Sequence, residues 1–127
     1  MILKLTNKDK NFYQYMGRFF GSRIVQKETN DRIYDDPEKI WYIYLKNNNP
    51  IGFISIKENV IKNIYAINSE CIYDLLLEVQ SDIQIAPSTI TKSYLDIYQK
   101  CAFRILDNNY KNFVTISTTI NKSGEAS

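Results

Sequence analysis

The sequence predicts an α+β fold: a single domain with a central mixed, mostly antiparallel sheet flanked by helices. The 127 residues are 44% hydrophobic and 24% charged, a balance typical of one compact globular domain. Strand-forming segments dominate, and the hydrophobic period changes to 3.6 residues in two separate stretches, which favours the α+β class. We expect the domain to span residues 1–120 and residues 121–127 to form a polar C-terminal tail.

The N-terminal third is predicted to hold one strand, two helices and a long loop. Residues 2–6 form the strand. In residues 12–20, large apolar side chains recur at i, i+3, i+4, i+7 and i+8, which places them on one helical face, and Gly21 follows as the stop. Residues 22–28 can form a second short helix. Residues 29–38 are rich in Asp, Asn and Pro and predict a polar loop, and loops of this length are often functional.

The middle of the chain is predicted to form a meander of consecutive antiparallel strands. Residues 40–45, 51–56 and 61–67 are rich in β-branched and aromatic side chains. The intervening residues 47–50 and 58–59 contain asparagine and favour tight turns.

The C-terminal half returns to helices and ends in a hairpin. The predicted elements are a helix over 72–79, a strand over 82–86, a helix over 94–101 and paired strands over 103–106 and 113–119. Asn68 or Ser69 can cap the first helix, and Ser88 or Thr89 the second, because a short side-chain oxygen accepts the free amides of the first turn.

The periodic apolar side chains of these elements are expected to pack in one core, because each face can be buried only against the others. The side chains expected in this core are Phe12, Phe19, Trp41, Ile43, Phe53, Ile54, Ile64, Leu75, Leu76, Val79 and Phe103.

Composition excludes several function classes. The chain has no histidine, which rules out His-based triads and His-containing zinc sites, and we expect no metal. Cys71 and Cys101 each lie in an apolar pattern, as buried thiols of a cytoplasmic protein do. A net charge of +2 is too small to indicate a nucleic-acid or membrane partner. No run approaches the roughly 20 apolar residues of a membrane helix.

The order of elements resembles the GNAT acyltransferase fold over nearly the whole chain. The segment 49–56, Asn-Pro-Ile-Gly-Phe-Ile-Ser-Ile, is similar to the second meander strand of that family. The segment 95–105 is similar to its late helix-to-strand motif, with Ala102 where the family usually has glycine. The resemblance implies transfer of an acyl group from acetyl-CoA or another acyl donor to an amine, on a small molecule or a protein.

The chain departs from the family where the cofactor's pyrophosphate is usually held. The family has an Arg/Gln-x-x-Gly-x-Gly/Ala turn there, whose amides bind the anion at a helix N-terminus. Residues 67–72 contain neither glycine nor a basic residue, and Glu70 adds a carboxylate. Either the cofactor is held differently, or the donor is another molecule, or the chain is a catalytically silent binding or inhibitor module.

A second resemblance involves short segments only. Residues 20–23, 33–36 and 39–42 are similar to a pattern in small phage-encoded GNAT-like proteins. Some of these resemble the Mom-type enzymes that modify adenine in phage DNA. This resemblance implies a nucleic-acid substrate.

The GNAT resemblance assigns a proton donor and a donor-binding strand. Tyr98 stands five residues before Phe103, where the family has a tyrosine that often protonates the departing thiolate. The alternative is a helix-face tyrosine that packs on the sheet. The backbone of the predicted strand edge would hold the donor, and its residues are Ile64, Tyr65, Ala66 and Ile67.

The polar loop and the turn before it supply the remaining candidates. Crowding of the adjacent Asp35 and Asp36 carboxylates can raise one pKa and supply a general base, or both can be solvated loop residues. Gly21, Ser22 and Arg23 can form an anion-binding turn in which Arg23 reaches a phosphate, or a helix stop with a surface arginine. Tyr34, beside the carboxylate pair, is a candidate substrate contact.

Overall fold

The structure is a computed structural model that describes residues 1–118; residues 119–127, with the predicted end of the domain and its tail, lie outside the described residues. The elements are β1 (Ile2–Leu5), α1 (Phe12–Met16), α2 (Arg23–Thr29), β2 (Ile40–Lys46), β3 (Asn49–Lys57), β4 (Val60–Ala66), α3 (Ser69–Asp82), β5 (Ser88–Thr91), the 3-10 helix η1 (Lys92–Tyr94), α4 (Leu95–Lys100), β6 (Arg104–Asp107) and β7 (Phe113–Ser117). Among residues 1–118, no helix has the length and apolar character needed to cross a bilayer.

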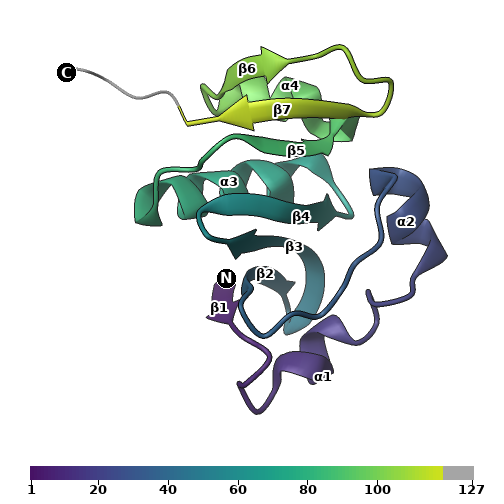
Figure 1. The fold of residues 1–127 in the computed structure, drawn as a ribbon. Coiled ribbons are helices and arrows are strands. Elements are labelled where there is room, and N and C mark those ends of the chain that lie inside the picture. The colour runs from purple at the N-terminus through teal and green to yellow at the C-terminus, as the bar shows by residue number, and fades with distance from the viewer. Residues whose placement is uncertain (119–127) are drawn as a thin grey trace.

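The strands form two antiparallel sheets that lie one above the other in Figure 1. The first has the order β1-β2-β3-β4 and the second the order β5-β7-β6. The α+β class, with antiparallel strands flanked by helices, is confirmed. The division into two sheets differs from the single sheet that the sequence predicted, because no strand pairing of the described residues joins β4 to β5.

The first sheet is buried on both faces, which gives two cores. All eleven side chains predicted for the core are buried. Phe12 of α1 packs with Trp41 and Phe53 on one face, whereas Ile54 and Leu75 belong to a cluster on the opposite face, under α3 and α4. The expectation of one core is therefore wrong, because successive side chains of a strand point to opposite faces.

The first predicted helix is shorter than its apolar pattern. α1 ends at Met16, and turns carry the chain through Phe19, which remains buried, and Phe20 to Gly21. Gly17 interrupts the pattern, and glycine is among the weakest helix formers. Gly21 has a φ of 78°, a left-handed conformation that suits glycine and reverses the chain before α2.

The C-terminal half differs from the prediction around Pro87. α3 runs on to Asp82, and the strand predicted at 82–86 lies after the proline as β5 instead. The next helical turn is capped by the Thr91 hydroxyl, which accepts from the Ser93 amide at 3.2 Å. Ser88 cannot serve as that cap, because its Oγ accepts the Ile61 amide at 2.9 Å and links β5 to β4.

Hydrogen bonds join β4 and β5 near their N-terminal ends. There the Ala86 amide donates to the Asn59 carbonyl at 2.8 Å. At the C-terminal end of β4 the place of a neighbouring strand is taken by η1. The Ala66 backbone therefore contacts the Tyr94 side chain instead of another strand, and the candidate site lies at this contact.

Candidate functional site

A cavity of about 180 Å³ lies where the end of β4, the start of α3, η1 and α2 converge. Its lining residues are Ile24, Glu28, Tyr65, Ala66, Ile67, Asn68, Ser69, Ser93 and Tyr94. One carboxylate and two phenols therefore meet a strand edge at a single small cavity.

Tyr94 supplies the hydroxyl closest to the β4 backbone. The Ala66 amide donates to Tyr94 Oη at 3.3 Å, and Oη is 3.5 Å from the Ala66 carbonyl oxygen that it can donate to. η1 is fixed to α2, because Ser93 Oγ donates to the Glu28 carbonyl at 2.7 Å. Burial raises the pKa of Tyr94 above its ordinary value, so the phenol keeps its proton at neutral pH.

Glu28 is the carboxylate of this cavity. It stands in the last turn of α2, and its negative charge adds to burial in raising the pKa values of Tyr65 and Tyr94. An exposed carboxylate next to two protonated phenols can accept a proton from an amine that enters the cavity.

Gly52 on β3 sets how closely the two strands pack at this point. It pairs with Ala66, and a Cβ on Gly52 would stand 2.6 Å from the Ala66 Cβ and 3.0 Å from the Tyr65 carbonyl oxygen. A side chain here would push the end of β4 toward the cavity. Glycine therefore keeps the Ala66 backbone in its place.

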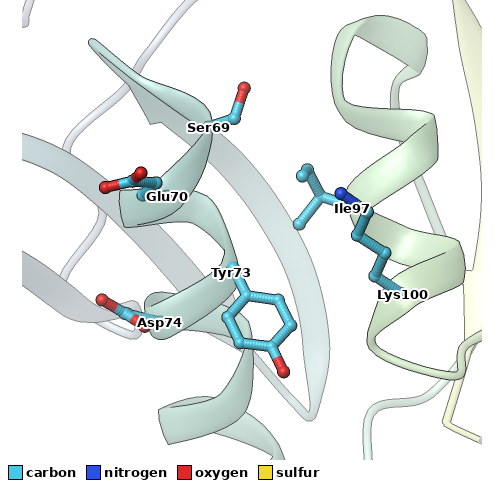
Figure 2. Close-up of a pocket in the computed structure, with 6 residues that line it drawn as sticks. All are labelled: Ser69, Glu70, Tyr73, Asp74, Ile97 and Lys100. Atoms are coloured by element: carbon cyan, nitrogen blue, oxygen red, sulfur yellow. The ribbon is translucent and has the colours of Figure 1, made fainter.

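A wider hollow of about 700 Å³ lies between α3 and α4 (Figure 2). It is lined by Ser69, Glu70, Tyr73, Asp74, Ile97 and Lys100. Tyr73 and Ile97 lie between the two helices in Figure 2, and Ser69 also lines the smaller cavity, so the two spaces meet at the start of α3.

Solved structures of other proteins share this architecture. Escherichia coli ElaA superimposes with a TM-score of 0.70 at 11% identity, covering 94% of this chain and 99% of its own. The Campylobacter jejuni N-acetyltransferase PseH, solved in complex with acetyl coenzyme A, gives 0.54 at 15% identity, covering 92% of this chain and 97% of its own. The fold is GNAT-like. A domain from Methanocaldococcus jannaschii gives 0.55 at 12% identity, covering 92% and 97%. No model of a known protein family and no curated protein matches the sequence.

The start of α3 is the position at which the GNAT resemblance places the diphosphate of coenzyme A. Its residues do not fit that anion. Asn68 Oδ1 accepts the Cys71 amide at 3.1 Å, as the cap predicted from the sequence. One helix-terminal amide is thereby already paired. Glu70 then adds negative charge to the first turn. A polyphosphate at this place would meet a carboxylate and fewer free amides.

Among the site residues predicted from the sequence, those of the donor-binding strand 64–67 are the ones that reach the cavity. Tyr65, Ala66 and Ile67 all line it. Ile64 is buried in the core under α3 and contributes to packing. Their role in donor binding stays a prediction.

Tyr98 lies away from the cavity of the GNAT-like fold. Its side chain is fully buried, and its hydroxyl donates to the Thr91 carbonyl at 2.8 Å. Burial raises the pKa of this phenol well above its ordinary value. The position is that of the alternative interpretation, a tyrosine packed on the sheet, and Tyr98 does not line the cavity at the end of β4. Its role as a proton donor stays a prediction.

Tyr98→Phe is accordingly expected to affect stability more than turnover. Removing the hydroxyl leaves the buried Thr91 carbonyl without that donor, which should cost about 1–3 kcal/mol of unfolding free energy. Urea denaturation and activity per folded molecule, measured on one preparation, test this. A loss of turnover of tenfold or more at unchanged stability would return Tyr98 to the mechanism.

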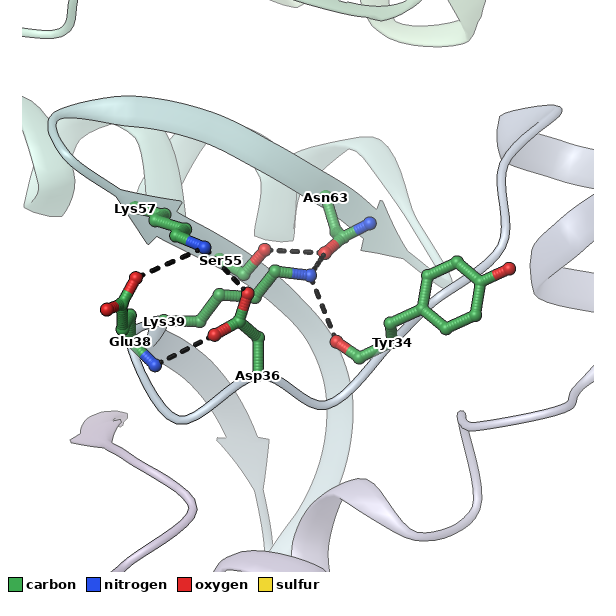
Figure 3. Close-up of polar contacts among 7 residues, drawn as sticks. All are labelled: Tyr34, Asp36, Glu38, Lys39, Ser55, Lys57 and Asn63. Carbon is green, nitrogen blue, oxygen red and sulfur yellow. Dashed lines mark hydrogen bonds and ion pairs between the residues drawn. The ribbon is translucent and has the colours of Figure 1, made fainter.

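The two loop carboxylates are both engaged in contacts, of which Figure 3 shows those of Asp36, and neither residue lines the cavity at the end of β4. Asp36 accepts the Glu38 amide at 2.9 Å and pairs with Lys57 at 2.9 Å. These contacts lower the pKa of Asp36, the opposite of the rise expected from crowding. Asp35 accepts a hydrogen bond from the Tyr13 hydroxyl. The pair fastens the loop to β3 and α1 and does not line the cavity at the end of β4.

The remaining sequence candidates also take structural positions. Ser22 caps α2, and its Oγ accepts the Val25 amide at 3.3 Å. Arg23 is exposed at the first position of α2. Tyr34 is exposed, with the Arg32 guanidinium 5.8 Å from its ring centre.

A buried lysine that the sequence did not single out fixes the polar loop to the sheet (Figure 3). Lys39 Nζ donates to the Tyr34 carbonyl at 3.0 Å and to Asn63 Oδ1 at 2.9 Å, and it lies 5.3 Å from the Trp41 ring centre. Ser55 Oγ donates to the same Asn63 oxygen at 2.7 Å. Burial lowers the pKa of Lys39. This network holds residues 30–39 in place.

Sequence reasoning missed Glu28 and Tyr94. Tyr94 and Tyr98 both fall in the predicted helix over 94–101, four residues apart and so on one face. Their spacing does not indicate which of the two hydroxyls faces a cavity. Glu28 is the last residue of the predicted short helix over 22–28, and the apolar pattern of that helix is too short to show which of its faces meets the sheet. A search for carboxylates at predicted helix ends that precede long loops would have included it.

Proposed function

We propose that this chain is a transferase that moves an acyl group from a thioester donor to an amine, with the cavity at the end of β4 as its reaction centre. The observation that carries the proposal is the convergence of Glu28, Tyr94 and the Ala66 backbone at one cavity in a GNAT-like fold. The fold relative PseH was solved with acetyl coenzyme A, which supports an acyl donor here. The two buried thiols agree with a reducing cytoplasm, where we place the protein.

The chemistry divides between the two ionisable side chains. Glu28 accepts a proton from the amine nitrogen as that nitrogen attacks the acyl carbonyl carbon and the new C–N bond forms. Tyr94 donates its phenolic proton to the sulfur as the C–S bond breaks. The proton taken up by Glu28 balances the one that Tyr94 gives, so the products are an amide and a thiol.

The proposal is tested by thiol release from an acyl thioester in the presence of small primary amines and lysine peptides. Amine-dependent release that Glu28→Gln abolishes supports it. Absence of release with every amine would instead favour the silent binding module. Release only with DNA would favour nucleic-acid modification. Those two alternatives from the sequence stay predictions.

Coenzyme A itself is expected to bind weakly, no tighter than about the millimolar range that a few generic contacts give. The physical reason is the carboxylate of Glu70 and the occupied Cys71 amide at the start of α3. Calorimetry with coenzyme A measures this. As a matched comparison, Glu70→Gln should tighten binding by severalfold, and micromolar affinity of the natural chain would contradict the argument.

A further inference from the structure

We propose that Tyr94 controls access of the donor to β4, because its hydroxyl occupies the Ala66 amide that an incoming acyl carbonyl oxygen would accept from. Donor binding and the Tyr94–Ala66 contact then exclude each other. The inference rests on the proposed function, in which the same hydroxyl later serves as the proton donor.

The orientation of β4 places the Ala66 backbone groups on its open side. The Ile67 amide donates to the Ile51 carbonyl of β3 at 2.8 Å. Because successive residues of a strand point their backbone groups to opposite sides, the amide and carbonyl of Ala66 point away from β3. Ala66 is buried, and a buried amide needs a partner. Tyr94 provides the partner that a neighbouring strand would provide elsewhere.

The hydrogen bonds between Tyr94 Oη and the Ala66 backbone are long enough for a ligand to replace them. The two Tyr94–Ala66 distances, 3.3 and 3.5 Å, lie beyond the usual 2.7–3.2 Å for N–H···O and 2.5–3.0 Å for O–H···O hydrogen bonds. One hydroxyl is shared between two backbone groups of a single residue. A carbonyl oxygen that reached the amide directly would make a shorter bond, and the adjacent cavity of about 180 Å³ leaves room for it.

Tyr94 is nevertheless held close by. The Thr91 cap and the bond from Ser93 to the Glu28 carbonyl fix η1 at its start and against α2. A rotation of the phenol away from Ala66 therefore keeps its hydroxyl beside the cavity. The displaced hydroxyl is then placed to donate its proton to the leaving sulfur.

The test compares the natural chain with Tyr94→Phe and with Tyr98→Phe as the matched control. The probe is S-acetyl-N-acetylcysteamine, an acetyl thioester that lacks the diphosphate and so avoids Glu70. In Tyr94→Phe we expect the Ala66 amide to exchange its hydrogen at least several times faster and the probe to bind about 2- to 10-fold more tightly, the worth of one hydrogen bond. Tyr98→Phe should leave probe affinity unchanged, because its hydroxyl bonds to Thr91. Any faster exchange that follows from its lower stability should be shared by amides throughout the core, whereas in Tyr94→Phe the increase should be largest at Ala66.

The possible results distinguish a failure of the access role of Tyr94 from a failure of the proposed acyl transfer. Equal probe affinity and equal Ala66 exchange in the natural chain and Tyr94→Phe would overturn the inference, while amine-dependent turnover would keep the proposed function. Failure of every variant to bind the probe would overturn both. If Tyr94→Phe does not fold, the natural chain still decides, because probe binding must then shift the NMR signal of the Ala66 amide, and an unmoved signal contradicts the inference.

Discussion

Glu28→Gln is expected to lower the turnover number of the proposed acyl transfer by about 10²- to 10⁴-fold, the usual contribution of a general base. Glutamine keeps the length and shape of the side chain but cannot accept the amine proton. The backbone carbonyl that holds Ser93 is unchanged, so the short helix η1 should stay in place. Stopped assays of thiol release, with saturating amine and donor, measure the effect.

Glu38→Gln provides the matched control for this variant. Glu38 is also an exposed carboxylate, but it pairs with Lys57 at 3.2 Å on the loop fastened to β3 and does not line the cavity. Its turnover should stay within about twofold of the natural chain, since an exposed pair contributes little. Equal turnover in both variants would remove Glu28 from the mechanism.

Phe53→Ala should lower the free energy of unfolding by about 3–5 kcal/mol, the usual cost of emptying a buried aromatic position. Phe53 is fully buried in the core under α1 and α2. Its ring centre lies 5.0 Å from that of Phe19, 5.7 Å from Trp41 and 5.9 Å from Tyr65. Chemical denaturation monitored by tryptophan fluorescence measures the change.

Tyr110→Ala is the aromatic comparison on the surface. Tyr110 is exposed, so its removal should shift stability by no more than about 0.5 kcal/mol. A similar loss in both variants would show that the core on the α1 side does not carry the stability we assign to it.

The elements that the sequence predicted well are those whose signal is local. The meander at 40–67 and the cap at Asn68 follow from β-branched runs and from one side-chain oxygen, and neither needs knowledge of distant contacts. The strand after Pro87 was misplaced by several residues, because the apolar residues before it, such as Ile85, are buried in an extended connection rather than in a ladder. Burial alone does not distinguish the two.

The candidate site was harder to predict because it is made of long-range contacts. Tyr94 meets Ala66 across 28 residues of sequence. The carboxylates chosen from the loop, Asp35 and Asp36, were adjacent in sequence, yet the structure uses them for fastening the chain. Glu28 reaches the cavity because α2 packs beside η1, where Ser93 Oγ donates to the Glu28 carbonyl. Adjacency in sequence is a weak guide to a site that only the fold brings together.

The close contact between Gly52 and Ala66 also constrains how this chain can evolve. Any other residue at position 52 would bring a Cβ to 2.6 Å from the Ala66 Cβ and shift the end of β4 that lines the cavity. Under the proposed function, sequences related to this chain that keep acyl transfer should therefore retain glycine at this position. Lineages that have lost the reaction are free of that selection. The residue at this single position offers a marker for separating active descendants from silent ones.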